Sequence, residues 1–221
     1  MIELLRKNNR LNEAIFLMIS GIICFAFSMY RISYTDSNMF LFLNWNLFLA
    51  FIPWALTSYV VLKPKIQAKK GTVFLLLFAW LIFFPNAPYI LTDLFHLKWS
   101  SDMPMWFDLI LILLFAWSGL MFGLLSLWDI EKMIGDKLSR FWTSTIVTSL
   151  LFIGGFGIYL GRFLRWNSWD VVNNPSNLMY DIGDRVIHPF DHPRTWGVTL
   201  FMGLFLNMVY WSFKLLRKRE A

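Results

Sequence analysis

The chain has 221 residues, a formal net charge of +6 and a sequence pI near 9.5, and its residues are 57% hydrophobic, 19% aromatic and 15% charged. About a quarter of the residues of soluble domains are charged, so this composition excludes an ordinary soluble domain and indicates a membrane protein. The apolar runs are longer than the alternating strands of about ten residues that build outer-membrane barrels, so they are expected to cross the bilayer as helices.

The number of apolar runs predicts the number of crossings. A hydrocarbon core of about 30 Å is spanned by roughly 20 apolar residues in a helix. Six runs of about this length lie between polar breaks, at 13–30, 40–62, 72–91, 104–128, 142–163 and 196–214. No low-complexity linker divides the chain. The sequence therefore predicts an all-α polytopic membrane protein, a six-helix bundle that forms one transmembrane domain over residues 1–221.

Positive charge is distributed unevenly between the two sides of this bundle. With six crossings, 14 Lys and Arg residues fall on the side of the termini and 6 on the other side. Cytoplasmic loops hold the excess of positive charge, so both termini are expected to be cytoplasmic. Attraction to an anionic inner leaflet explains the basic pI, so membrane lipids are the expected partners and nucleic acid is not. The oligomeric state stays undefined.

The third apolar run contains a predicted break. The thirteen residues 72–84 form about 20 Å of helix, too little to cross alone. Pro85 lacks a backbone donor, and Pro88 disfavours helix at the residue before it. We expect Asn86 to cap a new half-helix over residues 87–96, whose positive end would point into the bundle and suit an anionic group. A plain proline kink is the alternative interpretation.

Asp93 and His96 follow this break at i and i+3, and therefore on one face of the expected half-helix. Asp108 lies one turn into the fourth run, where an ionisable side chain is costly and by default marks a functional site. These residues place the predicted site on the outer side of the membrane.

The fifth break, residues 165–195, is about thirty residues long, and a loop of that length is usually functional. Apolar residues recur at helical spacing over 176–187, which predicts a short amphipathic helix lying in the membrane interface. Pro175 would begin this helix and Pro189 would end it. Asp184 and Arg185 fall on its polar face.

Arg162 and Arg165 end the fifth run on the outer side, against the usual sidedness of positive charge, so they need an anionic partner. Asp108, Asp170 or a ligand would supply it. The predicted ligand-binding residues are Asn86, Asp93, His96, Asp108, Arg162, Arg165, Asp170, Asp184 and Arg185.

Glycine pairs spaced four apart predict close helix packing. Gly119 and Gly123 form one pair, and Gly157 and Gly161 the other. Because a multi-helix protein has many internal interfaces, we expect both pairs to serve contacts inside the bundle rather than dimerisation.

Three functions remain open for the polar outer face. It could bind or transport an anionic ligand such as a lipid headgroup, held by arginines and a helix end. Alternatively, Asp93, His96, His188 and His192 could hold a divalent metal such as zinc, whose bound water attacks a lipid ester or a phosphoester. Pro189 makes a regular helix between the last two histidines improbable. A structural or sensory membrane protein without catalysis is the third interpretation.

Two long motifs carry a family resemblance. FFPNAPYILTDLFHL at residues 83–97 and YLGRFLRWNSWDVVNNP at residues 159–175 resemble the bacterial membrane family known as domain of unknown function 1361. The resemblance extends roughly from the second run to the sixth. It implies a multi-pass protein of the bacterial cytoplasmic membrane, and it implies no catalytic residue.

Overall fold

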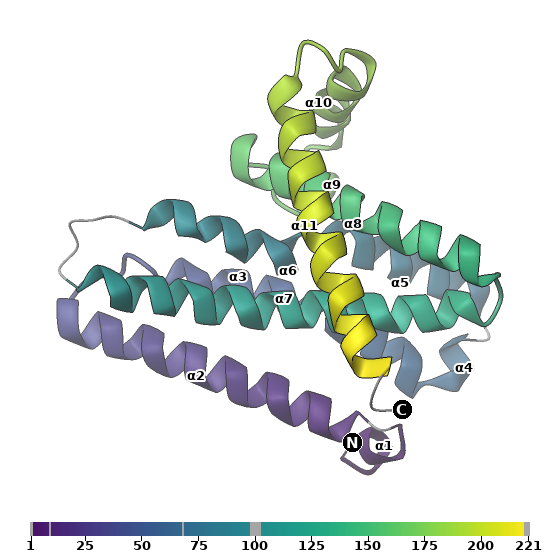
Figure 1. The fold of residues 1–221 in the computed structure, drawn as a ribbon, viewed down its shortest axis with the longest axis horizontal. Coiled ribbons are helices and arrows are strands. Elements are labelled where there is room, and N and C mark those ends of the chain that lie inside the picture. The colour runs from purple at the N-terminus through teal and green to yellow at the C-terminus, as the bar shows by residue number, and fades with distance from the viewer. Residues whose placement is uncertain (1, 9, 68, 98–102, 219–221) are drawn as a thin grey trace. The chain divides into compact units, whose positions relative to one another are not determined.

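The computed structural model describes residues 2–8, 10–67, 69–97 and 103–218 (Figure 1). Within these ranges every regular element is helical, and six helices are long and apolar enough to cross a membrane. The predicted all-α polytopic fold is therefore confirmed. Of the cations counted above, Lys98 and Arg219 lie outside the described residues.

Five of the six spans are single α-helices: α2 (Leu11–Thr35), α3 (Phe42–Leu62), α7 (Met105–Gly135), α8 (Arg140–Phe163) and α11 (Pro193–Lys218). The third span is built from three consecutive pieces: α5 (Lys70–Phe83), α6 (Asn86–Tyr89) and the 3-10 helix η1 (Ile90–His96). The described part of the chain has four further helices: α1 (Ile2–Lys7), α4 (Pro64–Gln67), α9 (Asp170–Asn173) and α10 (Pro175–Ile187). The expected break in the third span is thus present.

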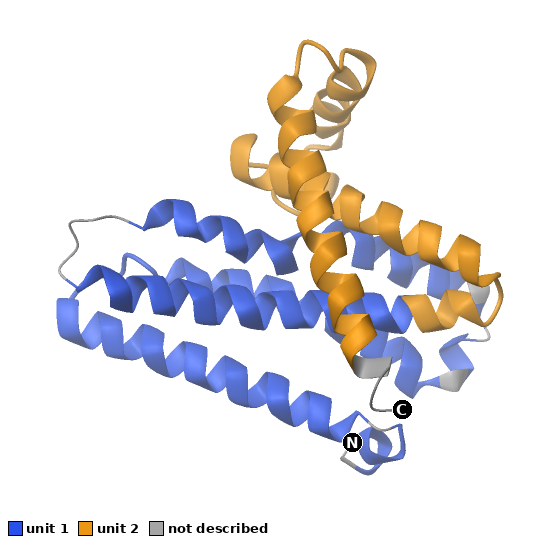
Figure 2. Cartoon of the chain, in the orientation of Figure 1, with its two compact units in different colours: residues 1–130 blue, residues 131–221 orange. Residues whose placement is uncertain are grey.

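The chain divides into two compact units, Met1–Ile130 and Glu131–Ala221, with the boundary inside α7 (Figure 2). Each unit is described by itself below. The expectation of one transmembrane domain stays a prediction.

Unit 1 is organised around α7, which is buried over 72% of its most apolar window. The α2 helix runs beside it: the Phe27 and Phe107 rings stack at 5.8 Å, and Cys24 Sγ lies 3.3 Å from Ser118 Oγ (Figure 1). From the third span, Trp80 Nε1 donates a hydrogen bond to Ser126 Oγ at 3.0 Å. These two contacts pair polar side chains with one another inside the apolar core, as a low-dielectric interior favours.

Small residues let the end of the third span approach α7 closely. A Cβ added at Gly119 would lie 2.8 Å from the carbonyl oxygen of Ala87, and one at Gly123 would lie 2.9 Å from the Ala87 Cβ. The prediction that this glycine pair packs inside the bundle is confirmed. This close contact fixes the backbone of α6, which contains Pro88 and directly follows Pro85.

In unit 2, α8 packs along α11. The backbones come close at Gly155, where an added Cβ would lie 2.8 Å from the Thr199 carbonyl oxygen and 3.0 Å from the Gly203 nitrogen. The spacing of glycines in the sequence did not single out this contact. The packing role expected for Gly157 and Gly161 stays a prediction.

Candidate functional site

The break in the third span is a local tightening of the helix. Phe84, Pro85 and Ile90 all keep right-handed helical backbone angles. The Ala87 N–H donates to the Phe84 carbonyl at 3.1 Å, three residues back instead of four. This shift leaves the Phe83 carbonyl without its usual donor, so the freed oxygen needs another partner inside a membrane span.

Asn86 supplies that partner, since its Nδ2 donates to the Phe83 oxygen at 2.9 Å. The start of α6 has no side-chain cap hydrogen bond. The predicted capped half-helix is therefore wrong. Two prolines remove donors from the helix, and the asparagine amide satisfies a carbonyl behind it.

Asp93 and His96 come together on η1. In a 3-10 helix, residues three apart eclipse one another, and His96 Nδ1 lies 3.7 Å from Asp93 Oδ1. The Asp93 side chain is only 1% exposed, and its Oδ2 accepts a hydrogen bond from Asn46 Nδ2 of α3 at 2.9 Å. The His96 ring packs on Phe42 at 5.2 Å, and its side chain is 44% exposed. The carboxylate of Asp93 thus lies near the imidazole of His96, at a distance too long for a hydrogen bond.

Asp108 has a partner within unit 1, and this partner is Arg31 of α2. Arg31 Nε and Nη2 lie 2.7 and 3.3 Å from the two carboxylate oxygens, and both side chains are 2% exposed. The guanidinium also lies 4.6 Å from the centre of the Phe40 ring. This fork-shaped contact neutralises both charges. Arg31 lies at the end of its span and Asp108 at the start of the fourth, but no local pattern in the sequence pairs them.

A second buried charge network in unit 1 was not predicted. Arg10 Nη2 lies 2.8 Å from Glu13 Oε1, and Arg10 Nη1 lies 2.8 Å from Asp129 Oδ2. Trp54 Nε1 donates to Glu13 at 2.6 Å, and Thr57 Oγ1 donates to Asp129 at 2.9 Å. Asp129 directly follows the predicted fourth span, 104–128, and this position was the available signal, because ionisable residues at membrane depth are rarely without a partner.

In unit 2, the predicted amphipathic helix is confirmed as α10, with Pro175 at its first position and its last helical residue at Ile187. Asp181 organises its polar face. Trp166 Nε1 donates to Asp181 Oδ2 at 2.7 Å, and Arg185 Nη1 lies 3.2 Å from Asp181 Oδ1. Arg185 is thus engaged within its own helix.

The other predicted acidic residues of unit 2 also have partners. Asp170 Oδ2 accepts a hydrogen bond from the Asn167 N–H at 2.7 Å, which closes the turn before α9. Asp184 Oδ1 lies 3.0 Å from His188 Nδ1, and its Oδ2 lies 2.7 Å from His192 Nε2. One carboxylate therefore holds both histidines after the end of α10.

These contacts with His188 and then with His192 lower the pKa of the Asp184 carboxyl from its ordinary value. A lowered folded-state pKa means that the ionised carboxylate stabilises the fold above the unfolded value of about 3.9. That contribution is lost as the pH falls through the folded pKa. The turn after α10 is therefore expected to loosen in acid.

An Asp184→Ala variant tests this turn. At pH 7 we expect lower amide-exchange protection at His188 and Asp191, whose N–H groups bond to carbonyls within the turn. Below the folded pKa the variant and the unaltered protein should be equally protected, because neither then carries a charged carboxylate there. Asp170→Ala is the matched control. Equal protection of the two proteins at pH 7, measured by exchange mass spectrometry, would contradict the role of this carboxylate.

Among the described residues, Arg165 and Arg194 of unit 2 have no acidic partner, as is also the case for Arg140 at the start of α8. Arg165 follows the end of α8 and is exposed, with a left-handed φ of 63°. Its backbone turns the chain so that the Trp166 N–H reaches the Leu160 carbonyl at 3.1 Å. Arg194, at the start of α11, is exposed and lies with its guanidinium 4.2 Å from the centre of the Phe163 ring. Arg162 is half-buried and already has a partner.

No group of three or more His, Cys, Asp or Glu side chains within the described ranges is placed to hold a metal ion. Asp93 and His96 belong to unit 1, and His188 and His192 to unit 2. The metal site proposed from the four residues together stays a prediction.

Comparison with known proteins gives one result. A protein-family model described as "Protein of unknown function (DUF1361)" matches residues 45–209, which include both motifs named above. No curated protein and no solved structure matches the chain.

Proposed function

The chain belongs to the family described as "Protein of unknown function (DUF1361)" and is a multi-pass membrane protein, and on that premise we propose that unit 2 binds an anionic lipid headgroup at the outer face of the membrane. The observation that carries the proposal is the pair of exposed arginines, Arg165 and Arg194, beside the amphipathic α10.

The two arginines suit a phosphate. Arg194 stacks on Phe163, two residues before Arg165, so both cations belong to one end of the α8 and α11 pair. Stacking on a ring uses the face of the guanidinium and leaves its N–H groups for an acceptor. A guanidinium binds phosphate oxygens through two parallel hydrogen bonds.

The surroundings suit a membrane surface. Val172, Tyr180, Ile187 and Phe190 are 81%, 74%, 71% and 94% exposed. Four large apolar side chains in water on one short segment would be unfavourable, whereas an amphipathic helix in the interface buries such residues among lipid headgroups and upper acyl chains. This segment would therefore hold the arginines at headgroup depth.

The orientation belongs to the same proposal. Six crossings place the end of α8 on the side opposite the N-terminus, and the excess of positive charge at the termini favours a cytoplasmic location for them. The arginine pair then faces outward. Labelling of a single cysteine introduced at Asn174 by a membrane-impermeant reagent in intact cells, in a Cys24→Ala background, would test this directly.

A binding measurement tests the proposal itself. The purified protein is titrated with vesicles of phosphatidylglycerol or of phosphatidylcholine, and Arg165→Gln with Arg194→Gln is compared with Lys137→Gln with Arg140→Gln. The second pair removes two exposed cations from another part of unit 2. We expect the first pair to weaken phosphatidylglycerol binding by about fivefold for each charge. Equal losses in the two double variants would refute the assigned site.

Arg165→Gly separates binding from stability. A left-handed backbone costs a non-glycine residue roughly 1–2 kcal/mol, so glycine is expected to raise the melting temperature while phosphatidylglycerol binding falls. Asp36→Gly, at the other left-handed position with φ 50°, should leave binding unchanged. If Arg165→Gly left binding at the level of the unaltered protein, the strained arginine would have no part in headgroup recognition.

A further inference from the structure

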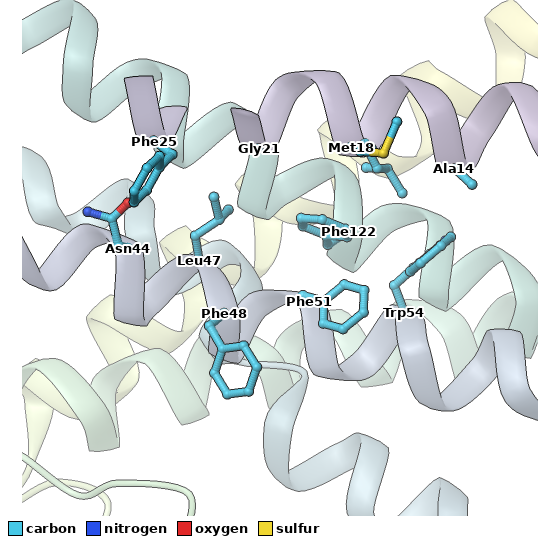
Figure 3. Close-up of a pocket in the computed structure, with 11 residues that line it drawn as sticks. Ala14, Met18, Gly21, Phe25, Asn44, Leu47, Phe48, Phe51, Trp54 and Phe122 are labelled. Carbon is cyan, nitrogen blue, oxygen red and sulfur yellow. The ribbon is translucent and has the colours of Figure 1, made fainter. Parts of the chain in front are cut away.

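A groove of about 450 Å³ lies in unit 1 between α2 and α3, with Phe122 of α7 at its base (Figure 3). Asn44 is the only lining residue with an amide or charged side chain. Phe51 and Phe122 meet edge to face at 5.6 Å between ring centres. The walls include Met18, Phe25 and Phe48, which are 59%, 55% and 52% exposed. An apolar surface of this kind at membrane depth needs an apolar occupant.

The groove is elongated. On α2 its lining runs from Ala14 to Phe25, a length of about 16 Å at the helical rise. An extended hydrocarbon chain can lie along a groove of this length.

The residues that line the groove favour an acyl chain over a transmembrane helix as its occupant. Helices that pack in membranes present small residues so that their backbones can approach. Here the bulky rings of Phe48, Phe51 and Trp54 form one wall. The space next to Gly21 is open, since a Cβ added there would meet no atom within 4 Å. Flexible methylenes can fill the irregular gaps between rings, which a rigid helix cannot.

We propose that this groove binds one acyl chain of an anionic phospholipid whose phosphate is held by Arg6 and Lys7. The groove begins one turn inside the start of α2, and α1, whose last turn carries these two cations, packs against α2. Both side chains are exposed and have no acidic partner among the described residues. Two cations that precede the groove along the chain match the headgroup of such a lipid, and the apolar lining matches its acyl chain.

This site goes beyond the headgroup site of unit 2, because it lies in the other unit and uses other residues. Arg10 does not contribute to it, since Glu13 and Asp129 already neutralise its charge. The headgroup cations lie at the N-terminal side of the bundle, where the anionic inner leaflet is expected.

Photolabelling tests the site. The protein is reconstituted with phosphatidylglycerol or phosphatidylcholine that carries a diazirine in the middle of one acyl chain, and labelled peptides are mapped by mass spectrometry. We expect labelling at Met18 and Phe48, at least about fivefold stronger with phosphatidylglycerol. Gly21→Leu should lower it roughly tenfold, because the new side chain takes the space of about two methylenes.

Matched variants keep the outcomes distinct. Gly71→Leu on α5, also open within 4 Å, should leave groove labelling unchanged. Arg6→Gln with Lys7→Gln should remove the preference for phosphatidylglycerol over phosphatidylcholine. Arg165→Gln with Arg194→Gln should leave groove labelling unchanged even if the proposal for unit 2 fails.

Three results would overturn the proposal. The first is equal labelling of the groove by both lipids, which would remove the assigned headgroup contact. The second is labelling as strong at Phe74 and Phe78 of α5, which are 73% and 50% exposed, since it would reflect bulk lipid. The third is a disulfide between copies at an introduced Met18→Cys in a Cys24→Ala background, since a second copy would then cover the groove.

Discussion

Replacing Arg31 with methionine is expected to lower the free energy of unfolding by about 3–5 kcal/mol, the usual cost of leaving one partner of a buried ion pair without its counter-ion. Asp108 is 1% exposed and takes both hydrogen bonds from this arginine. Without it, the carboxylate must bind a proton or draw water into the contact between α2 and α7. Either response weakens the packing of unit 1.

The double variant makes this prediction specific. Arg31→Met with Asp108→Leu removes both charges and replaces them with apolar volume, and such replacements of buried pairs are often neutral or stabilising. We expect thermal unfolding in detergent to show a large loss for each single variant and recovery in the double variant. Arg165→Met, at an exposed position, is the control. Additive losses in the double variant would show that each side chain acts independently of the other.

Gly155→Val is expected to cost about 3 kcal/mol, because its Cβ would meet two backbone atoms of α11 that no side-chain rotation can move. The Thr199 oxygen at 2.8 Å and the Gly203 nitrogen at 3.0 Å both belong to the facing helix. The two helices of unit 2 would have to separate along their contact, which exposes the apolar residues that they bury together.

Gly197→Ala is the matched control, since it lies on α11 and its added Cβ would meet no atom within 4 Å. Alanine in a helix is more favourable than glycine by about 0.5–1 kcal/mol, so this variant should be slightly more stable than the unaltered protein. The measurement is the midpoint of thermal unfolding in detergent for both variants. A Gly155→Val protein as stable as Gly197→Ala would mean that α8 and α11 do not pack closely at this point.

The transmembrane fold could be predicted from the sequence because its determinants are local. A helix that crosses a membrane needs a run of about 20 apolar residues, and this is a property of consecutive positions. The same holds for α10, which lies between Pro175 and Pro189 and has apolar residues at helical spacing. The long break after α8 was recognisable for the same reason.

The partners of the charged residues could not be predicted, because they depend on distant segments. Arg31 and Asp108 are 77 positions apart in the sequence. From the sequence alone, Arg162 or Arg165 was an equally good partner for Asp108. The predicted cap at Asn86 was wrong for another reason. Its residue type fits a helix cap. However, the Ala87 N–H bonds to the Phe84 carbonyl, so the Phe83 carbonyl is left without a backbone donor and accepts the hydrogen bond of the Asn86 amide.

The pair of Arg31 and Asp108 also bears on the order in which the helices assemble during synthesis. At about 5–20 residues per second, the ribosome needs roughly 4–15 s to proceed from the arginine to its acid, 77 positions later. During that interval α2 carries an uncompensated cation at membrane depth, which its long side chain can relieve only by reaching toward the surface. We therefore expect the first span to reach its final position only after the fourth has entered the bilayer.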